Sequence, residues 1–297
     1  MSGAAIRVGL VGGGAVAHAL SAALGSTQES RVKVWARRAA ASASVAALSP
    51  QNVEAVEQLR DLSSCEVLLV AVSDSALEEV AALLRSAFDG LDSAERVILH
   101  TSGARTGADA LSALGVAAAA LGSLHPLVAV AADAAPSSRV FAGRPFLVEA
   151  SSETATELGR RLVRAMGGFE VQLPDARTPE EASRHKARYH ALATMVATGV
   201  VTLVDRAAES MTRAGSSQDS ATRAAFRRAY GALAESAVQN VLRDAGPRVL
   251  TGAIARDDEA LVEQHRAALD DDLSAPLYRA VEEAARSMLQ DDENPKS

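Results

Sequence analysis

A glycine-rich turn near the start of the chain constrains the fold more than any other stretch. Residues 6–11 form a short apolar run that predicts a buried parallel strand, and an Ala-rich segment with helical periodicity follows the glycines. Gly12, Gly14 and Ala17 have the spacing G-x-G-x-x-A, one form of the dinucleotide-binding fingerprint. The first glycine permits a tight turn, the second admits a pyrophosphate to the backbone, and the small third residue allows close helix–strand packing. We expect a nucleotide-binding strand–turn–helix here, with a plain turn as the alternative.

The expected cofactor contacts come from this turn and from the loops that follow later strands. Amide groups at the start of the helix, together with its positive dipole end, suit phosphate oxygens. The predicted cofactor-binding residues are Gly12, Gly13, Gly14, Ala15, Val16, Arg37, Arg38, Val72, Ser73 and Ser102.

The second predicted strand and its exit, residues 31–38, indicate which dinucleotide binds. An NAD-specific fold places Asp or Glu at this strand end to bind the ribose 2′-hydroxyl. The sequence instead has Arg37 and Arg38, whose guanidinium groups suit a 2′-phosphate. We therefore expect NADP(H) to be preferred over NAD(H), with two solvated arginines at a helix start as the alternative.

Composition and charge exclude several classes of protein. The net charge of −7 and the aromatic content of 3% argue against nucleic-acid binding. The single cysteine, Cys65, suits a reducing cytoplasm, and the sequence has no metal-ligand spacing. Residues 191–204, the most apolar later stretch, fall short of the ~20 residues that span a bilayer. We expect a soluble cytoplasmic protein that binds a small-molecule substrate and no metal, nucleic acid or membrane.

Two polar residues follow later strands of the predicted sheet. Ser102 comes after the apolar run at residues 96–100, and His125 closes the small-residue run that begins at residue 116. Open α/β sheets bind their ligands at the carboxyl ends of the strands. Ser102 and His125 are therefore expected on the substrate side of the nicotinamide, with local turn hydrogen bonds as the alternative.

The chain changes character near residue 176. A strand–helix–strand pattern over residues 145–173 extends the sheet, and the chain beyond residue 180 is almost wholly helical. We predict an α/β domain at residues 1–176, with a Rossmann-type, doubly wound, mostly parallel sheet. An all-α domain follows at residues 177–290, and residues 291–297 are expected to form a disordered acidic tail.

The predicted helices of the second domain lie at residues 179–214, up to residue 243, and near residues 259–269 and 275–289. The first of them is apolar over most of its circumference, so it must be buried. Burial in so small a domain predicts packing against a second subunit, and hence a homodimer formed through these helices.

Four motifs in order resemble a known family: His100-Thr-Ser-Gly-Ala104, Gly122-Ser-Leu-His-Pro-Leu127, Lys186-x-x-Tyr189-His190-Ala191 and Leu250-Thr-Gly-Ala-Ile-Ala-Arg256. The chain resembles, over nearly its whole length, a bacterial family that joins a Rossmann-like NADP-binding domain to a helical C-terminal domain of unknown function. That family is similar to pyrroline-5-carboxylate reductase and to the 6-phosphogluconate and 3-hydroxyisobutyrate dehydrogenases. The resemblance implies a 6-phosphogluconate-dehydrogenase-like fold, NAD(P)-dependent oxidoreductase activity and a dimer.

The resemblance also implies catalytic residues on the first long helix. Lys186 matches the lysine that is the acid/base of hydroxyacid dehydrogenases, and His190, four residues later, shares its helix face. An interdomain salt bridge or a solvated helix end is the alternative role. Asn240, on the following helix, is a candidate to orient a substrate group, with buried amide hydrogen bonding as the alternative.

Two positions depart from the family pattern. Thr198-Gly199 replaces the Ser-Asn pair of relatives, and Asp257 replaces a glycine. Losing that glycine changes the loop if the position needs a positive φ.

The leading hypothesis is an NADP(H)-dependent oxidoreductase that transfers hydride to or from a small carbonyl, hydroxyacid or imine substrate in the cleft between the domains. Ser102 and His125 would position the substrate, and Lys186 or His190 would transfer the proton. The alternative function is a non-catalytic NADP(H)-binding sensor or partner protein, and a structural helical dimer with a vestigial sheet is a third possibility.

Overall fold

The structure is a computed structural model that describes residues 4–49, 51–91, 96–115, 118, 120–131, 137–215, 219–244, 246, 249–269, 271–272 and 274–293. The chain forms two compact units, residues 1–193 and residues 194–297.

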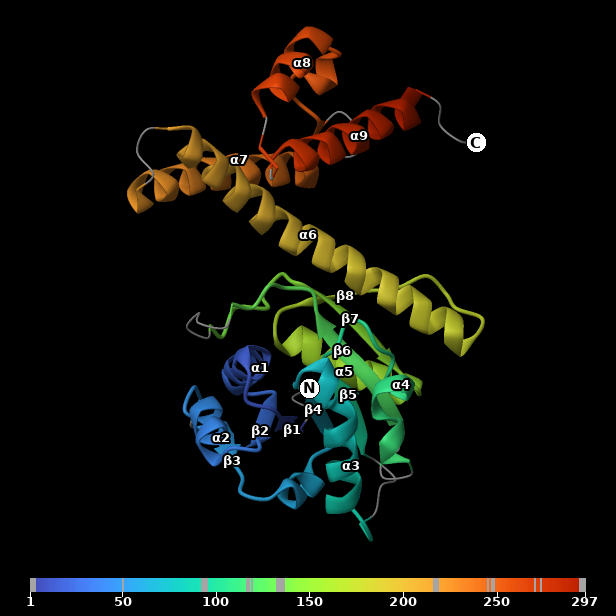
Figure 1. Cartoon of the computed structure of the whole chain (residues 1–297). Coiled ribbons are helices and arrows are strands. Elements are labelled where there is room, and N and C mark those ends of the chain that lie inside the picture. The colour runs from blue at the N-terminus through green and yellow to red at the C-terminus, as the bar shows by residue number, and fades with distance from the viewer. Residues whose placement is uncertain are drawn as a thin grey trace. The chain divides into compact units, whose positions relative to one another are not determined.

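The first unit is built on an eight-stranded sheet with the order β3-β2-β1-β4-β5-β6-β7-β8 (Figure 1). Its strands are β1 (Ile6–Val11), β2 (Ser30–Trp35), β3 (Val53–Ala55), β4 (Val67–Val70), β5 (Val97–His100), β6 (Ala120–Pro126), β7 (Pro145–Ala150) and β8 (Phe169–Val171). Neighbouring strands pair in parallel except β6 and β7, which are antiparallel. The predicted doubly wound, mostly parallel sheet is confirmed, although β3 is too short to have been recognised in the sequence.

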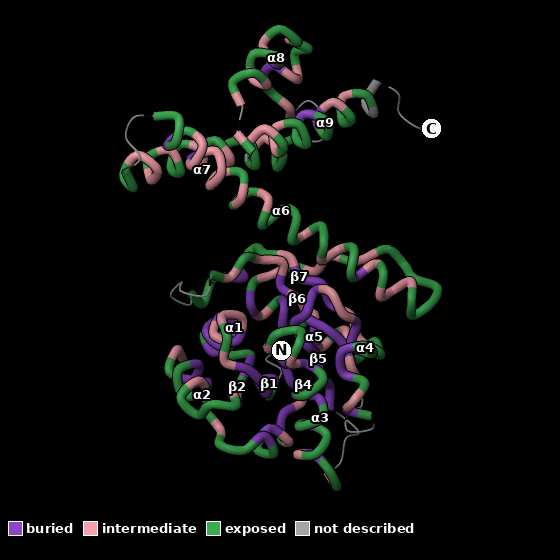
Figure 2. The backbone as a smooth tube through the Cα atoms, viewed as in Figure 1, coloured by how far each residue is buried: buried purple, intermediate pink, exposed green. Residues whose placement is uncertain are grey.

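Helices cover both faces of this sheet because each central strand is apolar on both sides. The helices are α1 (Ala15–Gly25), α2 (Ala39–Ala46), α3 (Leu77–Ala87), α4 (Gly107–Leu111) and α5 (Glu153–Ala165). Val8 and Leu10 of β1 belong to the core beneath α1, α2 and α5, whereas Val11 belongs to the core beneath α3 and α4. Figure 2 shows the buried residues concentrated in the strands. Such a two-faced core is what near-continuous apolar strands require.

The helical C-terminal region follows the predicted helices closely. It contains α6 (Pro179–Ala214), α7 (Ser220–Arg243), the short 3₁₀ helix η5 (Ile254–Arg256), α8 (Glu259–Ala268) and α9 (Ser274–Glu293). The two compact units divide inside α6, after residue 193, so the early turns of this helix belong with the sheet. The domain boundary near residue 176 stays a prediction from the change in sequence character.

The predicted disordered tail, residues 291–297, is wrong in its first part. Helix α9 continues to Glu293, because the first residue of this stretch that breaks a helix is Pro295. Residues 294–297 lie outside the described part of the chain.

The departure at Asp257 keeps the backbone conformation that a glycine would adopt. Asp257 has φ 53° and ψ 35°, which is the left-handed region. Aspartate tolerates this region better than most residues. Asp258 then caps α8 by accepting a hydrogen bond from the Leu261 amide at 3.1 Å. The substitution therefore leaves the left-handed turn in place.

Helices α6 and α7 carry apolar side chains that the single chain leaves exposed. These are Leu192, Met195, Val196, Val200, Val201, Leu203, Met211, Leu233, Val238, Val241 and Leu242. Among the described helices, α6 alone is long and apolar enough to cross a membrane by length and composition. That is weak evidence, because core helices of soluble proteins meet the same criteria. The described residues of one chain do not supply the burial predicted for α6.

Candidate functional site

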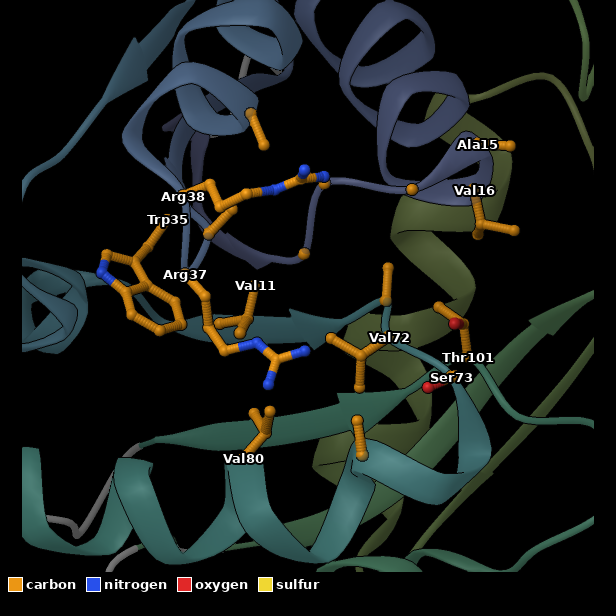
Figure 3. A pocket seen from close by; sticks show the side chains of 17 residues that line it. Val11, Ala15, Val16, Trp35, Arg37, Arg38, Val72, Ser73, Val80 and Thr101 are labelled. Carbon is orange, nitrogen blue, oxygen red and sulfur yellow. The ribbon is translucent and has the colours of Figure 1, made fainter. Parts of the chain in front are cut away.

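A cleft of about 630 Å³ lies at the carboxyl ends of β1, β2 and β4 (Figure 3). It is lined by Val11, Gly12, Gly13, Gly14, Ala15, Val16, Trp35, Ala36, Arg37, Arg38, Ala41, Ala71, Val72, Ser73, Ala76, Val80 and Thr101. This lining contains every predicted cofactor-binding residue except Ser102, whose neighbour Thr101 takes that place. The structure therefore brings the predicted set together at one end of the sheet.

The glycine turn has the geometry that a phosphate site needs. Gly12 has φ 142°, and a Cβ there would lie 2.1 Å from the Ala71 carbonyl oxygen, so no other residue fits. Its amide donates to the Trp35 carbonyl at 2.9 Å. Helix α1 then begins at Ala15 with no side-chain cap on its free amides and no acidic residue in its first turn. These free amides and the helix dipole favour an anion.

Gly14 leaves space beside those amides. A Cβ built on Gly14 meets no other group within 4 Å. Its φ of −90° is one that any residue adopts, so the fold itself does not demand glycine here. The open space is explained if a ligand approaches the backbone closely, and a dinucleotide pyrophosphate fits this requirement.

Two arginines border the far side of the cleft, where β2 ends. Figure 3 shows the side chains of Arg37 and Arg38 extending into the cleft. Arg37 lies 3.6 Å from the Glu79 carboxylate, but both side chains are more than half exposed, so this pair is weak. Arg38 has no carboxylate partner among the described residues. Both guanidinium groups are thus available to an anionic ligand.

A second group of polar residues adjoins the cleft through Thr101. The Thr101 carbonyl accepts a hydrogen bond from Nδ1 of His125 at 2.9 Å. Because a carbonyl only accepts, His125 carries its proton on Nδ1 and presents a bare Nε2 when neutral. Burial lowers the pKa of His125 below its usual value, with the charge of His190 adding to the effect. Ser102 is held next to it, donating from Oγ to Asp74 at 3.1 Å.

His125 is enclosed by two side chains of α6. The His125 ring packs edge-on against Tyr189 and His190, with ring centroids 5.8 Å and 5.7 Å away. A Cβ on Gly103 would lie 2.7 Å from Nε2 of His125 and 2.6 Å from Nδ1 of His190, so the missing side chain lets the two rings converge. Nδ1 of His190 and the Tyr189 hydroxyl are buried without a partner among the described atoms. We call His125, Tyr189 and His190 the histidine cluster.

Lys186 lies one turn earlier on α6 and is only 2% exposed. Its Nζ donates to Ser123 Oγ and, at 3.1 Å, to Glu149 Oε2. Ser123 also donates to this Glu149 oxygen at 3.2 Å. Burial lowers the pKa of Lys186, and the neighbouring Glu149 opposes that shift. We call Lys186, Ser123 and Glu149 the lysine cluster.

The structure thus distributes the predicted catalytic residues over three locations. His125, His190 and Ser102 meet near Thr101, and Lys186 is buried in the lysine cluster. Asn240 lies on α7 in the second unit, where its side-chain oxygen accepts from Arg243 at 2.6 Å. Its orienting role stays a prediction.

The sequence reasoning missed Ser123, Glu149, Asp74 and Gly103 as parts of these clusters. Ser123 and Glu149 face each other across the β6–β7 pair, a register that only the sheet order reveals. Asp74 lies far from Ser102 in the sequence, and its carboxylate accepts a hydrogen bond from Ser102 only in the folded chain. Glu149 did leave one signal, because it is the single charged residue in an otherwise apolar strand.

Comparison with protein families places the chain in a class of oxidoreductases. Residues 7–98 match the family described as NADP oxidoreductase coenzyme F420-dependent. Residues 144–285 match a domain of unknown function, DUF2520. No curated protein matches the sequence.

Solved structures share the fold over nearly the whole chain. A Bacteroides fragilis protein described as an NADP oxidoreductase has a TM-score of 0.69 at 19% identity, covering 95% of this chain and 98% of its own. Pyrroline-5-carboxylate reductase from Coxiella burnetii has a TM-score of 0.56 at 13% identity, covering 94% and 96%. Plasmodium falciparum pyrroline carboxylate reductase with NADP bound has a TM-score of 0.54 at 10% identity, covering 95% and 98%. At these identities the likeness establishes the fold.

The fold and the family matches define a Rossmann-like first domain of the NADP oxidoreductase class, followed by a helical region. More particularly, the chain joins an NADP oxidoreductase domain to a C-terminal DUF2520 domain, the combination that the four motifs indicated.

Two glycine substitutions separate folding from cofactor binding. We expect Gly14→Ala to leave the denaturation midpoint unchanged and to weaken NADPH binding roughly tenfold or more, because its methyl occupies only the open space. Gly12→Ala should destabilise the fold by at least about 1–3 kcal/mol, since it combines a strained φ with a backbone clash. Urea unfolding and NADPH fluorescence titration measure the two effects. Normal NADPH affinity in Gly14→Ala would contradict a pyrophosphate at this turn.

The buried His100 should make the free energy of unfolding depend on pH. This buried histidine accepts the Ser102 amide on Nδ1, and burial lowers its pKa to about 3. Between pH 6.5 and about 3 the unfolded chain binds a proton that the native state does not, so stability falls as pH falls. We expect His100→Asn, which keeps an acceptor, to flatten this slope by up to about 1.4 kcal/mol per pH unit. Urea unfolding from pH 7.5 to 4 measures it, and an unchanged slope would count against a neutral buried His100.

Proposed function

We propose that this protein is an NADP(H)-dependent oxidoreductase that transfers hydride to or from a small carbonyl, hydroxyacid or imine substrate. The observation that carries the proposal is the continuity between the cleft and the histidine cluster. Thr101 lines the cleft, and its carbonyl orients His125. Groups able to hold a substrate therefore stand beside the place where a cofactor fits.

A bound nicotinamide cofactor supplies the hydride. The glycine turn and α1 bind its phosphates, and this orients the rest of the molecule along the carboxyl ends of β1 and β4. Ser102, fixed by Asp74, and His125, fixed by Thr101, position the polar group of the substrate. Proton transfer requires a titratable side chain beside the substrate, and the sequence offers Lys186 and His190 as candidates.

The function is tested by a panel of small carbonyl, hydroxyacid and imine compounds. NADPH oxidation at 340 nm, or NADP reduction with the hydroxyacids, should occur with at least one compound and should fall with Gly14→Ala. If NADPH raises the melting temperature while no compound reacts, the protein is instead a nucleotide-binding sensor. If NADPH has no effect on melting, the nucleotide-binding proposal itself is overturned.

The cofactor preference rests on Arg37 and Arg38 at the end of β2. NADPH should bind more tightly than NADH, and Arg37→Ala with Arg38→Ala should weaken NADPH binding roughly 10- to 100-fold, because hydrogen bonds between charged groups are lost. Glu79→Ala is the matched control, since it frees Arg37 and should leave NADPH affinity at least as strong. Equal affinities for the two nucleotides in the unmodified protein would contradict a 2′-phosphate site.

We further propose that a second copy of the chain covers the exposed apolar side chains of α6 and α7, giving a homodimer. Exposed large apolar side chains in this number are typical of an interaction site. Light scattering without detergent should give twice the 30.7 kDa chain mass. Val201→Asp with Val241→Asp should yield monomers that still bind NADPH, whereas Leu83→Asp on α3, also exposed, should not. A monomer, or a protein soluble only in detergent, would contradict the dimer.

A further inference from the structure

Two clusters on one face of α6 are positioned differently relative to the cofactor cleft. Lys186 lines a separate cavity of about 390 Å³ together with Glu149. His125, by contrast, bonds directly to Thr101, which lines the cofactor cleft. Lys186, which the family resemblance marks as the acid/base, therefore lines a cavity other than the cleft that fits the cofactor.

The lysine cluster has the construction of a clamp. An ammonium group has three N–H donors, and Lys186 directs two of them to Ser123 and Glu149. These two acceptors stand opposite each other on β6 and β7. The contact therefore fixes the early turns of α6 to the antiparallel pair at a defined point. A buried lysine is costly unless paired, so losing either partner should loosen this attachment.

The histidine cluster depends on that attachment. His190 lies four residues after Lys186, so it sits one turn along the same helix face. Both imidazoles come so near to position 103 that a Cβ there would lie 2.6 Å from His190 and 2.7 Å from His125. The charged and titratable groups facing His125 are His190, Lys186 and Asp74, with Tyr189 against its ring. A small shift of α6 would separate the two imidazoles.

We propose that His125, with His190 beside it, handles the substrate proton, and that Lys186 is a positioning residue that acts by clamping α6 through Ser123 and Glu149. The proposal rests on the proposed function and assigns the proton step within it. In the reductive direction the substrate carbon accepts hydride from the reduced nicotinamide. The electron pair of its C=O or C=N bond moves to the oxygen or nitrogen, which takes the proton from Nε2 of protonated His125. Neutral His125 and the oxidised nicotinamide result, and His190 lies next to His125 to restore the proton from solvent.

The first test needs no substrate. NMR of ¹⁵N-histidine-labelled full-length protein should show His125 as the Nδ1–H tautomer in contact with His190. Lys186→Met and Glu149→Leu should each abolish the ring-to-ring contact, because each breaks the same clamp, while NADPH affinity stays within about twofold. Lys33→Met, at the other described lysine, is the control and should change nothing. A preserved ring contact in Lys186→Met would overturn the positioning role.

The second test uses any compound that the panel shows to react. Lys186→Met and Glu149→Leu should lower kcat to a similar extent, roughly 10- to 100-fold, yet keep the pH dependence of the parent. His125→Gln should lower kcat by a factor of about 10²–10⁴. It should also remove the part of the pH profile in which kcat changes with pH. Gly103→Ala should lower kcat while the lysine cluster stays intact. If Lys186→Met removes the pH dependence of kcat and His125→Gln keeps it, Lys186 is the acid/base and the proposal is wrong.

The two tests also separate this proposal from the function it rests on. If no compound reacts, the proposed function fails, while the NMR spectra still decide whether Lys186 positions the histidine cluster.

Discussion

The close approach of the Gly12 turn to Ala71 is the constraint on which the first unit depends. The backbone of this turn passes so near the Ala71 carbonyl that even a methyl group would overlap it. β1 lies between β2 and β4, so the strand order reverses direction at this point. Open α/β sheets bind ligands where the order reverses, because the connections diverge and leave a crevice. The cleft, the start of α1 and the two arginines all follow from that placement.

The attachment of α6 is the next constraint. A long apolar helix has many ways to lie on a sheet, and a buried ion pair with hydrogen bonds permits few of them. Hydrophobic contacts alone would give comparable stability, but they would not specify which residues of α6 lie against which strands. Lys186 in contact with Ser123 and Glu149 fixes which residues of α6 come next to the carboxyl ends of the strands. Tyr189 and His190 reach His125 for this reason.

Much of the fold was predictable because local patterns agreed with it. The glycine spacing, the apolar strands and the breakers around α6 identified the elements and most of their bounds. The grouping of the residues that line the cleft was predictable as well, since they follow strand ends in chain order. The predicted substrate-side role of Ser102 and His125 stays a prediction, although both follow strands at this end of the sheet.

The remaining parts of the site were not predictable, because they depend on pairing between distant segments. Ser123 meets Glu149 only through the antiparallel register of β6 and β7. Gly103 leaves space for His190, which lies on α6 much later in the chain. Lys186 was a catalytic candidate from the sequence, a role that stays a prediction, and its partners Ser123 and Glu149 were invisible there. The length of α9 was underestimated because an acidic end was taken as a sign of disorder.

A crystal structure of the full chain with NADPH tests the central claim most directly. The account predicts that the pyrophosphate contacts the amides of Gly14, Ala15 and Val16, and that the 2′-phosphate lies against Arg37 and Arg38. The nicotinamide should then lie beside Thr101 and His125. A nicotinamide that enters the cavity lined by Lys186 and Glu149, or a nucleotide bound away from the glycine turn, would contradict it.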